Sequence, residues 1–194
     1  MQLNRRKTVF ISGSAYEYGK FGDEGRDFIR ELTRTLLRND FRIISGFGSG
    51  VGNYVVEGAL HEIYVNSERK MTDQLRIFPF PTRTDLLESV HMNYRDDIIS
   101  QAGTAIFLFG NKLEDISIRE ADGMEKEFEI ARSHNALLIP VGASGYISER
   151  LWNHLVGQYD HYFDNREKFH WYQKLGNPET QPGELIETIL RIAE

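Results

Sequence analysis

The stretch IISGFGSGVGNYVVEGAL, residues 43–60, decides the fold of this chain. An apolar run leads into a turn with a glycine at positions 46, 48, 50 and 52, and a helix-like segment follows. A buried strand, a tight turn and a helix in this order form the repeating unit of a parallel α/β sheet. The glycines have two explanations: they expose backbone N–H groups to an anion, or they only permit a tight turn.

The same unit recurs along the chain. Apolar runs predict strands at 8–12, 42–45, 75–80, 104–110 and 136–142, and amphipathic segments predict helices at 23–40, 53–66, 85–102 and 123–135. Such continuous apolar strands are typical of sheets that are buried on both faces. We therefore predict one α/β domain over 1–194, a Rossmann-like, doubly wound, mainly parallel sheet with helices on both faces. Its core spans about 8–156, and a C-terminal helical extension spans about 157–194.

Composition excludes several functional classes. The chain has 194 residues, a formal net charge of −6 and no cysteine. An acidic chain is a poor candidate for nucleic-acid binding, which normally uses a basic face. No apolar run approaches the roughly 20 residues of a membrane span, and no signal peptide opens the chain. The absence of cysteine suits a cytoplasmic location, and no motif such as HExxH predicts a metal site.

Ligands of open parallel sheets bind beyond the carboxyl ends of the strands. Every predicted strand end in this chain carries glycine or proline, which predicts a pocket with backbone walls. The pattern Gly46-x-Gly48-x-Gly50-x-Gly52 matches neither the dinucleotide fingerprint nor a Walker loop, which disfavours an oxidoreductase or an ATPase. We favour a phosphate or ribose cradle, and a bare structural turn is the alternative.

Three charged residues are candidates for the site. Lys112 directly follows the fourth predicted strand and is expected to point toward this edge. The position of Arg95 in its helix fits a ligand contact and a solvated ion pair with Asp96 or Glu88 equally well. On helix propensity alone, Glu127 is predicted to be a surface glutamate.

The order of these motifs resembles the lysine-decarboxylase-like, or LOG, family of nucleotide-processing enzymes. Arg95 in MNYRDDI matches the arginine of that family's helix, and Glu127 in GMEKE matches its loop glutamate. The family's PGGxGT turn is replaced by FGNKLEDISIREADGM, residues 109–124. This resemblance implies a nucleotide-shaped pocket and, as one function, cleavage of a base from a nucleoside monophosphate.

A closer resemblance covers essentially the whole chain. It is carried by FISGSAYEYG (10–19), IISGFGSGVG (43–52), YRDDIIS (94–100), IFLFGNK (106–112) and KEFEIA (126–131). Together these motifs resemble the SLOG domain family of Thoeris anti-phage effectors. In that family a TIR protein makes a cyclic ADP-ribose isomer, the SLOG domain binds it, and an associated sirtuin-type domain then hydrolyses NAD.

The resemblance implies that this domain is a ligand-binding module without catalytic residues or a cofactor, in a homodimer or larger homo-oligomer. The implied ligand is a cyclic ADP-ribose isomer such as glycocyclic ADP-ribose. The sequence leaves open the linkage of that isomer, and whether these residues were excised from a longer effector or stand alone. The predicted ligand-binding residues are Arg95, Lys112, Glu127, Gly13, Ser14, Ala15, Gly46, Phe47, Gly48, Gly50, Pro81, Arg83, Gly110 and Asn111.

Overall fold

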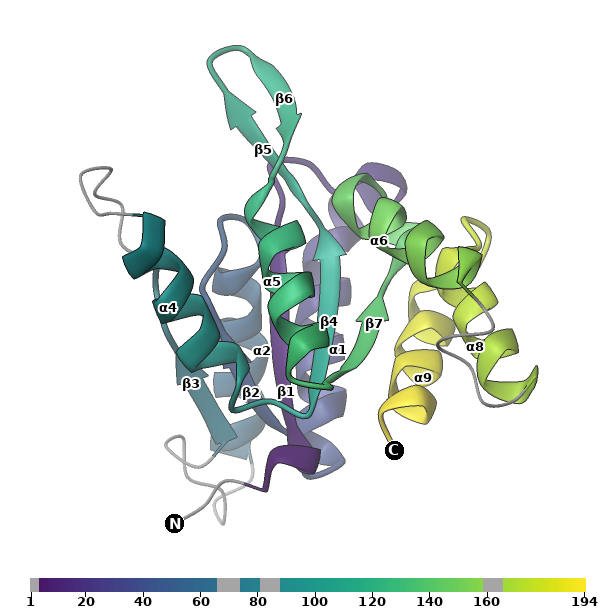
Figure 1. The fold of residues 1–194 in the computed structure, drawn as a ribbon. Helices are drawn as coiled ribbons and strands as arrows, with labels where there is room; N and C mark the ends of the chain where they lie inside the picture. The colour runs from purple at the N-terminus through teal and green to yellow at the C-terminus, as the bar shows by residue number, and fades with distance from the viewer. Residues whose placement is uncertain (1–3, 66–73, 81–87, 159–165) are drawn as a thin grey trace.

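Five parallel strands form the central sheet of the computed structural model, which describes residues 4–65, 74–80, 88–158 and 166–194 (Figure 1). The strand order is β3-β2-β1-β4-β7. The strands are β1 (Thr8–Ser14), β2 (Arg42–Ser45), β3 (Leu75–Ile77), β4 (Thr104–Phe109) and β7 (Leu137–Pro140). This all-parallel sheet confirms the predicted Rossmann-like α/β class.

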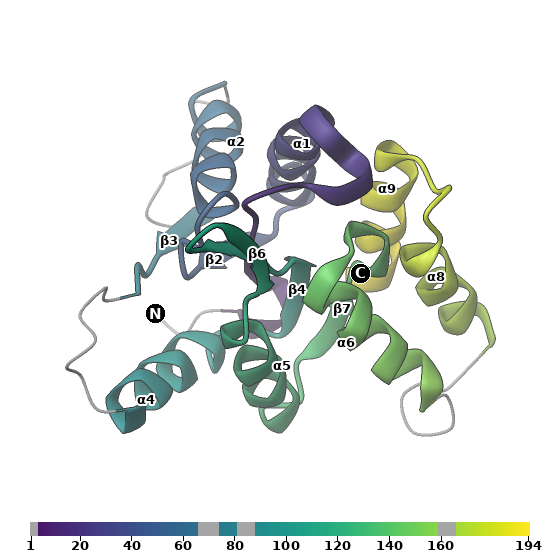
Figure 2. The same ribbon diagram turned by 90° about the horizontal axis from the view of Figure 1, so that it is seen from above.

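Helices cover both faces of the sheet, as predicted. One face carries α1 (Gly25–Arg38), α2 (Gly52–Val65) and α9 (Pro182–Ala193), and the other carries α4 (Glu88–Ile99), α5 (Gly123–Ser133) and α6 (Tyr146–Gly157) (Figure 2). The helix α8 (Arg166–Gly176) lies beyond β7, beside α6 and α9. Short 3-10 helices occur at η1 (Arg5–Lys7), η2 (Gly19–Glu24) and η3 (Gly142–Ser144). No described helix is both long and apolar enough to cross a bilayer.

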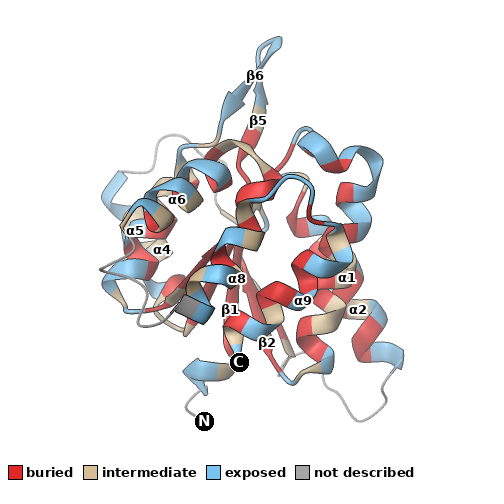
Figure 3. Ribbon diagram, turned by 90° about the vertical axis from the view of Figure 1, so that its right-hand side faces the viewer, coloured by how far each residue is buried: buried red, intermediate tan, exposed pale blue. Residues whose placement is uncertain are grey.

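The core lies between the sheet and the inner faces of these helices (Figure 3). Every residue of β4 is buried, as expected for a central strand of a parallel sheet. The apolar stripe of α1 is buried at Phe28, Leu32 and Leu36. Full burial of each such side chain stabilises the fold by about 1.5–3 kcal/mol.

The third strand is shorter than the predicted 75–80. The Phe78 N–H still donates to Ser45 O at 2.9 Å, but β3 ends at Ile77. Pro79 has no N–H group to continue the hydrogen-bond ladder. In the predicted helix 85–102, residues 85–87 lie outside the described residues, and α4 ends at Ile99.

The chain reverses direction across the sheet between β1 and β4. It moves outward from β1 to β2 and β3, then crosses back to β4 on the other side of β1. Such a switch point opens a crevice at the carboxyl ends of the two strands, where Ser14 pairs with Phe109. We call the loops that follow β1, β2, β3 and β4 the carboxyl edge.

A two-stranded hairpin projects from the carboxyl edge beyond β4 (Figure 1). It consists of β5 (Asn111–Glu114) and β6 (Ser117–Glu120), paired antiparallel. The sequence analysis did not predict this hairpin. It accounts for most of the segment that replaces the LOG family's PGGxGT turn.

Candidate functional site

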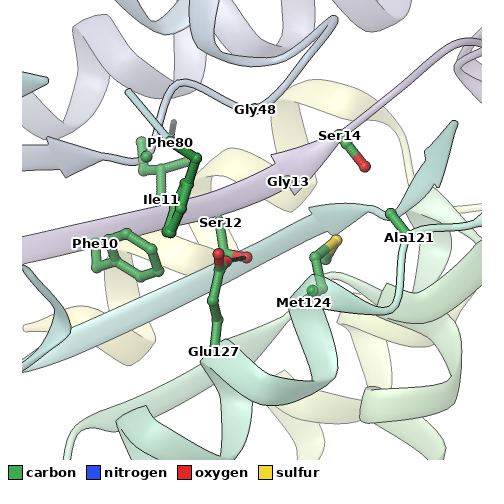
Figure 4. A pocket seen from close by; sticks show the side chains of 12 residues that line it. Phe10, Ile11, Ser12, Gly13, Ser14, Gly48, Phe80, Ala121, Met124 and Glu127 are labelled. Carbon is green, nitrogen blue, oxygen red and sulfur yellow. Dashed lines mark hydrogen bonds between the residues drawn. The ribbon is translucent and has the colours of Figure 1, made fainter. Parts of the chain in front are cut away.

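A cavity of about 140 Å³ opens at the carboxyl edge, at the switch point of the sheet (Figure 4). Its floor is the carboxyl half of β1, and its walls are the glycine turn, the chain after β3 and the start of α5. The lining residues are Phe10, Ile11, Ser12, Gly13, Ser14, Gly46, Gly48, Phe80, Ala121, Gly123, Met124 and Glu127. The sequence analysis had named Gly13, Ser14, Gly46, Gly48 and Glu127, but it missed Ser12 and Phe80.

Glu127 is a buried acid on the side of α5 that faces β1. Its exposed fraction is 8%, and its carboxyl group points toward Ser12 (Figure 4). The Ser12 Oγ donates a hydrogen bond to Glu127 Oε2 at 2.5 Å. Burial raises the pKa of Glu127 above its usual range, although this hydrogen bond and the Arg95 charge act in the opposite direction.

The prediction of a surface position for Glu127 is therefore wrong. The helical spacing held a signal for burial, because Met124 and Ala131 lie three residues before and four after Glu127. Residues at this spacing share a helix face. Both are buried, so position 127 belongs to the apolar face of α5.

Arg95 lies between Glu127 and an aromatic ring. Its Nε atom is 3.6 Å from Glu127 Oε1, and its guanidinium carbon is 4.6 Å from the centre of the Phe80 ring. The side chain is only 16% exposed, and its buried Nε has no hydrogen-bond partner within the described structure. The alternative of a solvated ion pair is wrong, because the Arg95 side chain is largely buried. Its two predicted partners bind other residues: Asp96 Oδ1 contacts His134 Nε2 at 2.8 Å, and Glu88 Oε1 contacts Lys126 Nζ at 2.6 Å.

The glycine turn packs directly against the end of β1. A Cβ on Gly48 would lie 1.9 Å from Gly13 O, and one on Gly50 would lie 1.7 Å from Ala15 O. Gly50 also has a φ of +70°, a conformation that favours glycine. The structural explanation thus accounts for both glycines. The ligand cradle stays a prediction, which the position of Gly48 in the cavity wall supports.

Asn111 fastens the loop after β1 to the base of the hairpin. The side chain is fully buried, and its Oδ1 accepts hydrogen bonds from the N–H groups of Tyr16 at 2.9 Å and Glu17 at 3.1 Å. Its Nδ2 donates to Glu17 O at 2.9 Å. These bonds give Asn111 a structural role, and its contact with a ligand stays a prediction.

Left-handed backbone occurs at two phenylalanines of the carboxyl edge. Phe47 has a φ of +59° and is 39% exposed, whereas Phe109 has the same φ and is fully buried. Gly110 follows with a φ of +106°. Such conformations cost about 1–3 kcal/mol in residues with a side chain, and they concentrate at functional sites.

Lys112 lies on the hairpin and does not line the cavity. Its Nζ is 3.8 Å from both Glu114 Oε2 and Asp122 Oδ1, and its side chain is 42% exposed. Pro81 and Arg83 lie outside the described residues. The structure thus brings Arg95 and Glu127 together, and Glu127 lines the same cavity as Gly46 and Gly48, while Lys112 lies on the adjoining hairpin. Within the described ranges, no three His, Asp or Glu side chains cluster as metal ligands would.

The chain matches the Sir2- and TIR-associating SLOG (STALD) family over residues 1–194. It is 40% identical over 194 residues to the NAD(+) hydrolase ThsA of Bacillus cereus (strain MSX-D12), an alignment that covers 98% of this chain and 40% of that protein. It is 38% identical to the NAD(+) hydrolase ThsA of Cytobacillus dafuensis, and that alignment covers 99% of this chain and 40% of the relative. It is 37% identical to the NAD(+) hydrolase ThsA of Acinetobacter baumannii (strain 532279), with 95% of this chain and 41% of the relative aligned.

The chain thus spans about two fifths of the length of these curated relatives. The family match extends over every motif on which the predicted resemblance was based, including the YRDDIIS segment with Arg95 and the KEFEIA segment with Glu127. This chain belongs to the Sir2- and TIR-associating SLOG family.

Proposed function

We propose that this chain is a sensor domain that binds a cyclic ADP-ribose isomer made by a TIR protein. Binding activates an associated sirtuin-type NADase in bacterial anti-phage defence. One observation carries the proposal: Glu127 lines a cavity at the switch point of the sheet, and Arg95 lies beside it with its Nε 3.6 Å from Glu127 Oε1. Nucleotide ligands of doubly wound folds bind at this position.

The charges around the cavity suit the groups of such a ligand. A Cβ on Gly123 would lie 3.3 Å from Arg95 Nη2, so the guanidinium is next to the first residue of α5. Free N–H groups and the helix dipole favour an anion there. A pyrophosphate at this point would receive donors from Arg95 and from the backbone. The Glu127 carboxylate is an acceptor suited to ribose hydroxyl groups.

The size of the cavity indicates where the rest of the ligand would lie. Small-molecule sites usually measure about 300–1,000 Å³, and the cavity holds about 140 Å³. A cyclic ADP-ribose isomer would therefore extend beyond it along the carboxyl edge. Lys112 and the exposed ring of Phe47 are available on that edge to contact it.

The relatives supply the context for a sensor. They are named NAD(+) hydrolases and are much longer than this chain. A domain of this family in such an effector would regulate hydrolysis carried out elsewhere in the protein. A ligand can act as a switch only when it binds one state more tightly than another. We infer that the ligand favours one packing of a homo-oligomer and so changes the arrangement of the attached NADase domains.

Ligand binding with and without turnover separates the possible functions. The purified 194-residue chain would be incubated with cyclic ADP-ribose isomers and with AMP, followed by thermal unfolding and chromatography of the nucleotide. Saturation at about 100 times the dissociation constant is expected to add about 2.7 kcal/mol of stability. The sensor proposal expects this gain with one cyclic isomer, and recovery of that isomer intact. It fails if no isomer binds.

One observation favours a second candidate, a LOG-type nucleotide N-glycosidase. Glu127 is a buried acid with a raised pKa in a cavity, which is a common property of catalytic carboxyl groups. Release of adenine or of ribose 5-phosphate from AMP in the same experiment would support this candidate. That activity would also have to disappear in a Glu127→Gln variant.

A further inference from the structure

The position of the Phe80 ring depends on two residues: Gly46 leaves space for it, and Tyr94 packs against it. A Cβ on Gly46 would lie 2.7 Å from Phe80 Cε2, so only glycine leaves room for the ring at its present place. The Tyr94 ring meets Phe80 edge to face, with 5.3 Å between ring centres and an interplanar angle of 88°. The Tyr94 hydroxyl donates to Pro79 O at 3.1 Å, which ties α4 to the chain just before Phe80.

This fixed ring lies against the Arg95 guanidinium. The distance of 4.6 Å from the guanidinium carbon to the ring centre is typical of a cation–π contact. Glu127 restrains the same side chain through its Nε. A flexible arginine loses rotamer entropy when a ligand orders its side chain, and this loss weakens binding. Two contacts therefore orient Arg95 before any ligand arrives.

We infer that Phe80 is a positioning residue of the ligand site, which holds Arg95 in its binding orientation, and that Gly46 is required because it admits the Phe80 ring. The inference rests on the proposed function, because it assumes that Arg95 binds the anionic ligand. The sequence analysis assigned no role to Phe80, and it assigned Gly46 to direct ligand contact.

The first test compares ligand affinity among variants of the full chain, with cyclic ADP-ribose isomers as the probe. Phe80→Leu keeps an apolar side chain but removes the aromatic face, and we expect it to weaken binding by roughly 2- to 30-fold. Phe80→Tyr is expected to retain affinity within about twofold, because its ring has a comparable face. Phe78→Leu is the matched control. Phe78 also packs against the core from the segment after β3, but it does not contact Arg95 in the described structure.

A double-mutant cycle separates positioning from direct contact. If Phe80 acts through Arg95, Phe80→Leu will have little further effect on affinity in an Arg95→Ala background, where no cation remains for the ring to hold. If the affinity losses of the two single variants instead add up in the double variant, Phe80 contacts the ligand itself, and the inference is overturned. Equal losses in Phe80→Leu and Phe78→Leu would also overturn it, because they would indicate a general loss of packing.

The second test needs no ligand. In the NMR spectrum of the free chain, the side-chain protons of Arg95, identified by their loss in Arg95→Lys, are expected to carry a ring-current shift that disappears in Phe80→Leu. An unchanged Arg95 spectrum in Phe80→Leu would overturn the inference, whatever the ligand. If the shift is present but no cyclic ADP-ribose isomer binds the wild-type chain, the proposed function fails while the Phe80–Arg95 contact stands.

Discussion

The Ser12 Oγ donates a hydrogen bond to Glu127 Oε2 across 2.5 Å, which joins the carboxyl end of β1 to the second turn of α5. Both residues are buried. The bond holds the carboxyl group in the cavity wall, where desolvation disfavours its charged form. The same contact therefore fixes the geometry of Glu127 and makes its protonation depend on the fold.

The stability of the chain is expected to depend on pH through Glu127. The pKa of this group is raised in the folded chain, so the folded state binds more protons than the unfolded state above the ordinary pKa of about 4.3. Its contribution to stability is fully present below that value and is lost as the pH rises through the folded pKa. Glu127→Gln cannot ionise, so we expect it to show a smaller fall in the free energy of unfolding over this interval.

Urea unfolding of wild type and variant from pH 4 to pH 8 measures this difference. Glu129→Gln is the matched control, because Glu129 is on the same helix but is exposed and paired with Arg132. In Glu129→Gln, the free energy of unfolding should change with pH as it does in the wild type. Parallel curves for wild type and Glu127→Gln would show that Glu127 titrates alike in the folded and unfolded chain.

Loss of Arg95 is expected to weaken ligand binding strongly. In the proposed complex, Arg95→Ala removes one partner of a buried charged contact, which typically costs about 2–5 kcal/mol, or roughly 30- to several-thousand-fold in affinity. Arg95→Lys keeps the charge but loses the forked geometry, so its affinity for the ligand should lie between those of the wild type and Arg95→Ala. Calorimetric titration of a cyclic ADP-ribose isomer measures this series. If Arg95→Ala binds the isomer with wild-type affinity, Arg95 does not contact the ligand.

Lys112 is expected to influence the rate of association more than the final contacts. Its ammonium is partly exposed on the hairpin, and charges at the rim of a site mainly change the association rate and its salt dependence. Lys112→Ala should therefore slow association at low salt and flatten its dependence on ionic strength. Stopped-flow mixing at several salt concentrations provides the measurement.

The hairpin offers a control within the same pair of strands. Arg119 lies directly opposite Lys112 in the register of β5 and β6 and is also exposed. Arg119→Ala removes one positive charge from the position beside Lys112, but Arg119 is not a predicted ligand-binding residue. If both variants slow association equally, the effect belongs to the overall charge of the hairpin, and Lys112 has no specific role.

The sheet could be predicted from the sequence because its strands are mostly apolar and the turns after them carry glycine or proline. The hairpin could not, because every residue of β6 is exposed and no buried face imposes an alternating apolar pattern. Its turn contains Asp115 with a φ of +55° and lacks glycine, so the usual hairpin signal is missing as well.

Parts of the site were hidden for a different reason. Arg95 and Glu127 lie on separate helices, and their pairing depends on how α4 packs against α5, which local spacing does not specify. The role of Phe80 depends on the space above Gly46, a contact between two loops. The glycine turn was recognised, but the sequence could not show that Gly48 and Gly50 face the backbone of β1 and its following loop.

Alanine substitution in the glycine turn is expected to destabilise the fold whether or not ligand is present. At Gly50 the added Cβ would collide with Ala15 O and the backbone would stay left-handed, so we expect a loss of at least about 1–3 kcal/mol. Gly48→Ala should cost a similar amount through its clash with Gly13 O. Gly183→Ala is the control, because a Cβ there meets nothing within 4 Å and lies in the first turn of α9. That change should be neutral or stabilise the chain by up to about 1 kcal/mol. Urea unfolding of the three variants measures these effects, and comparable stabilities would show that the turn can move away from β1 without cost.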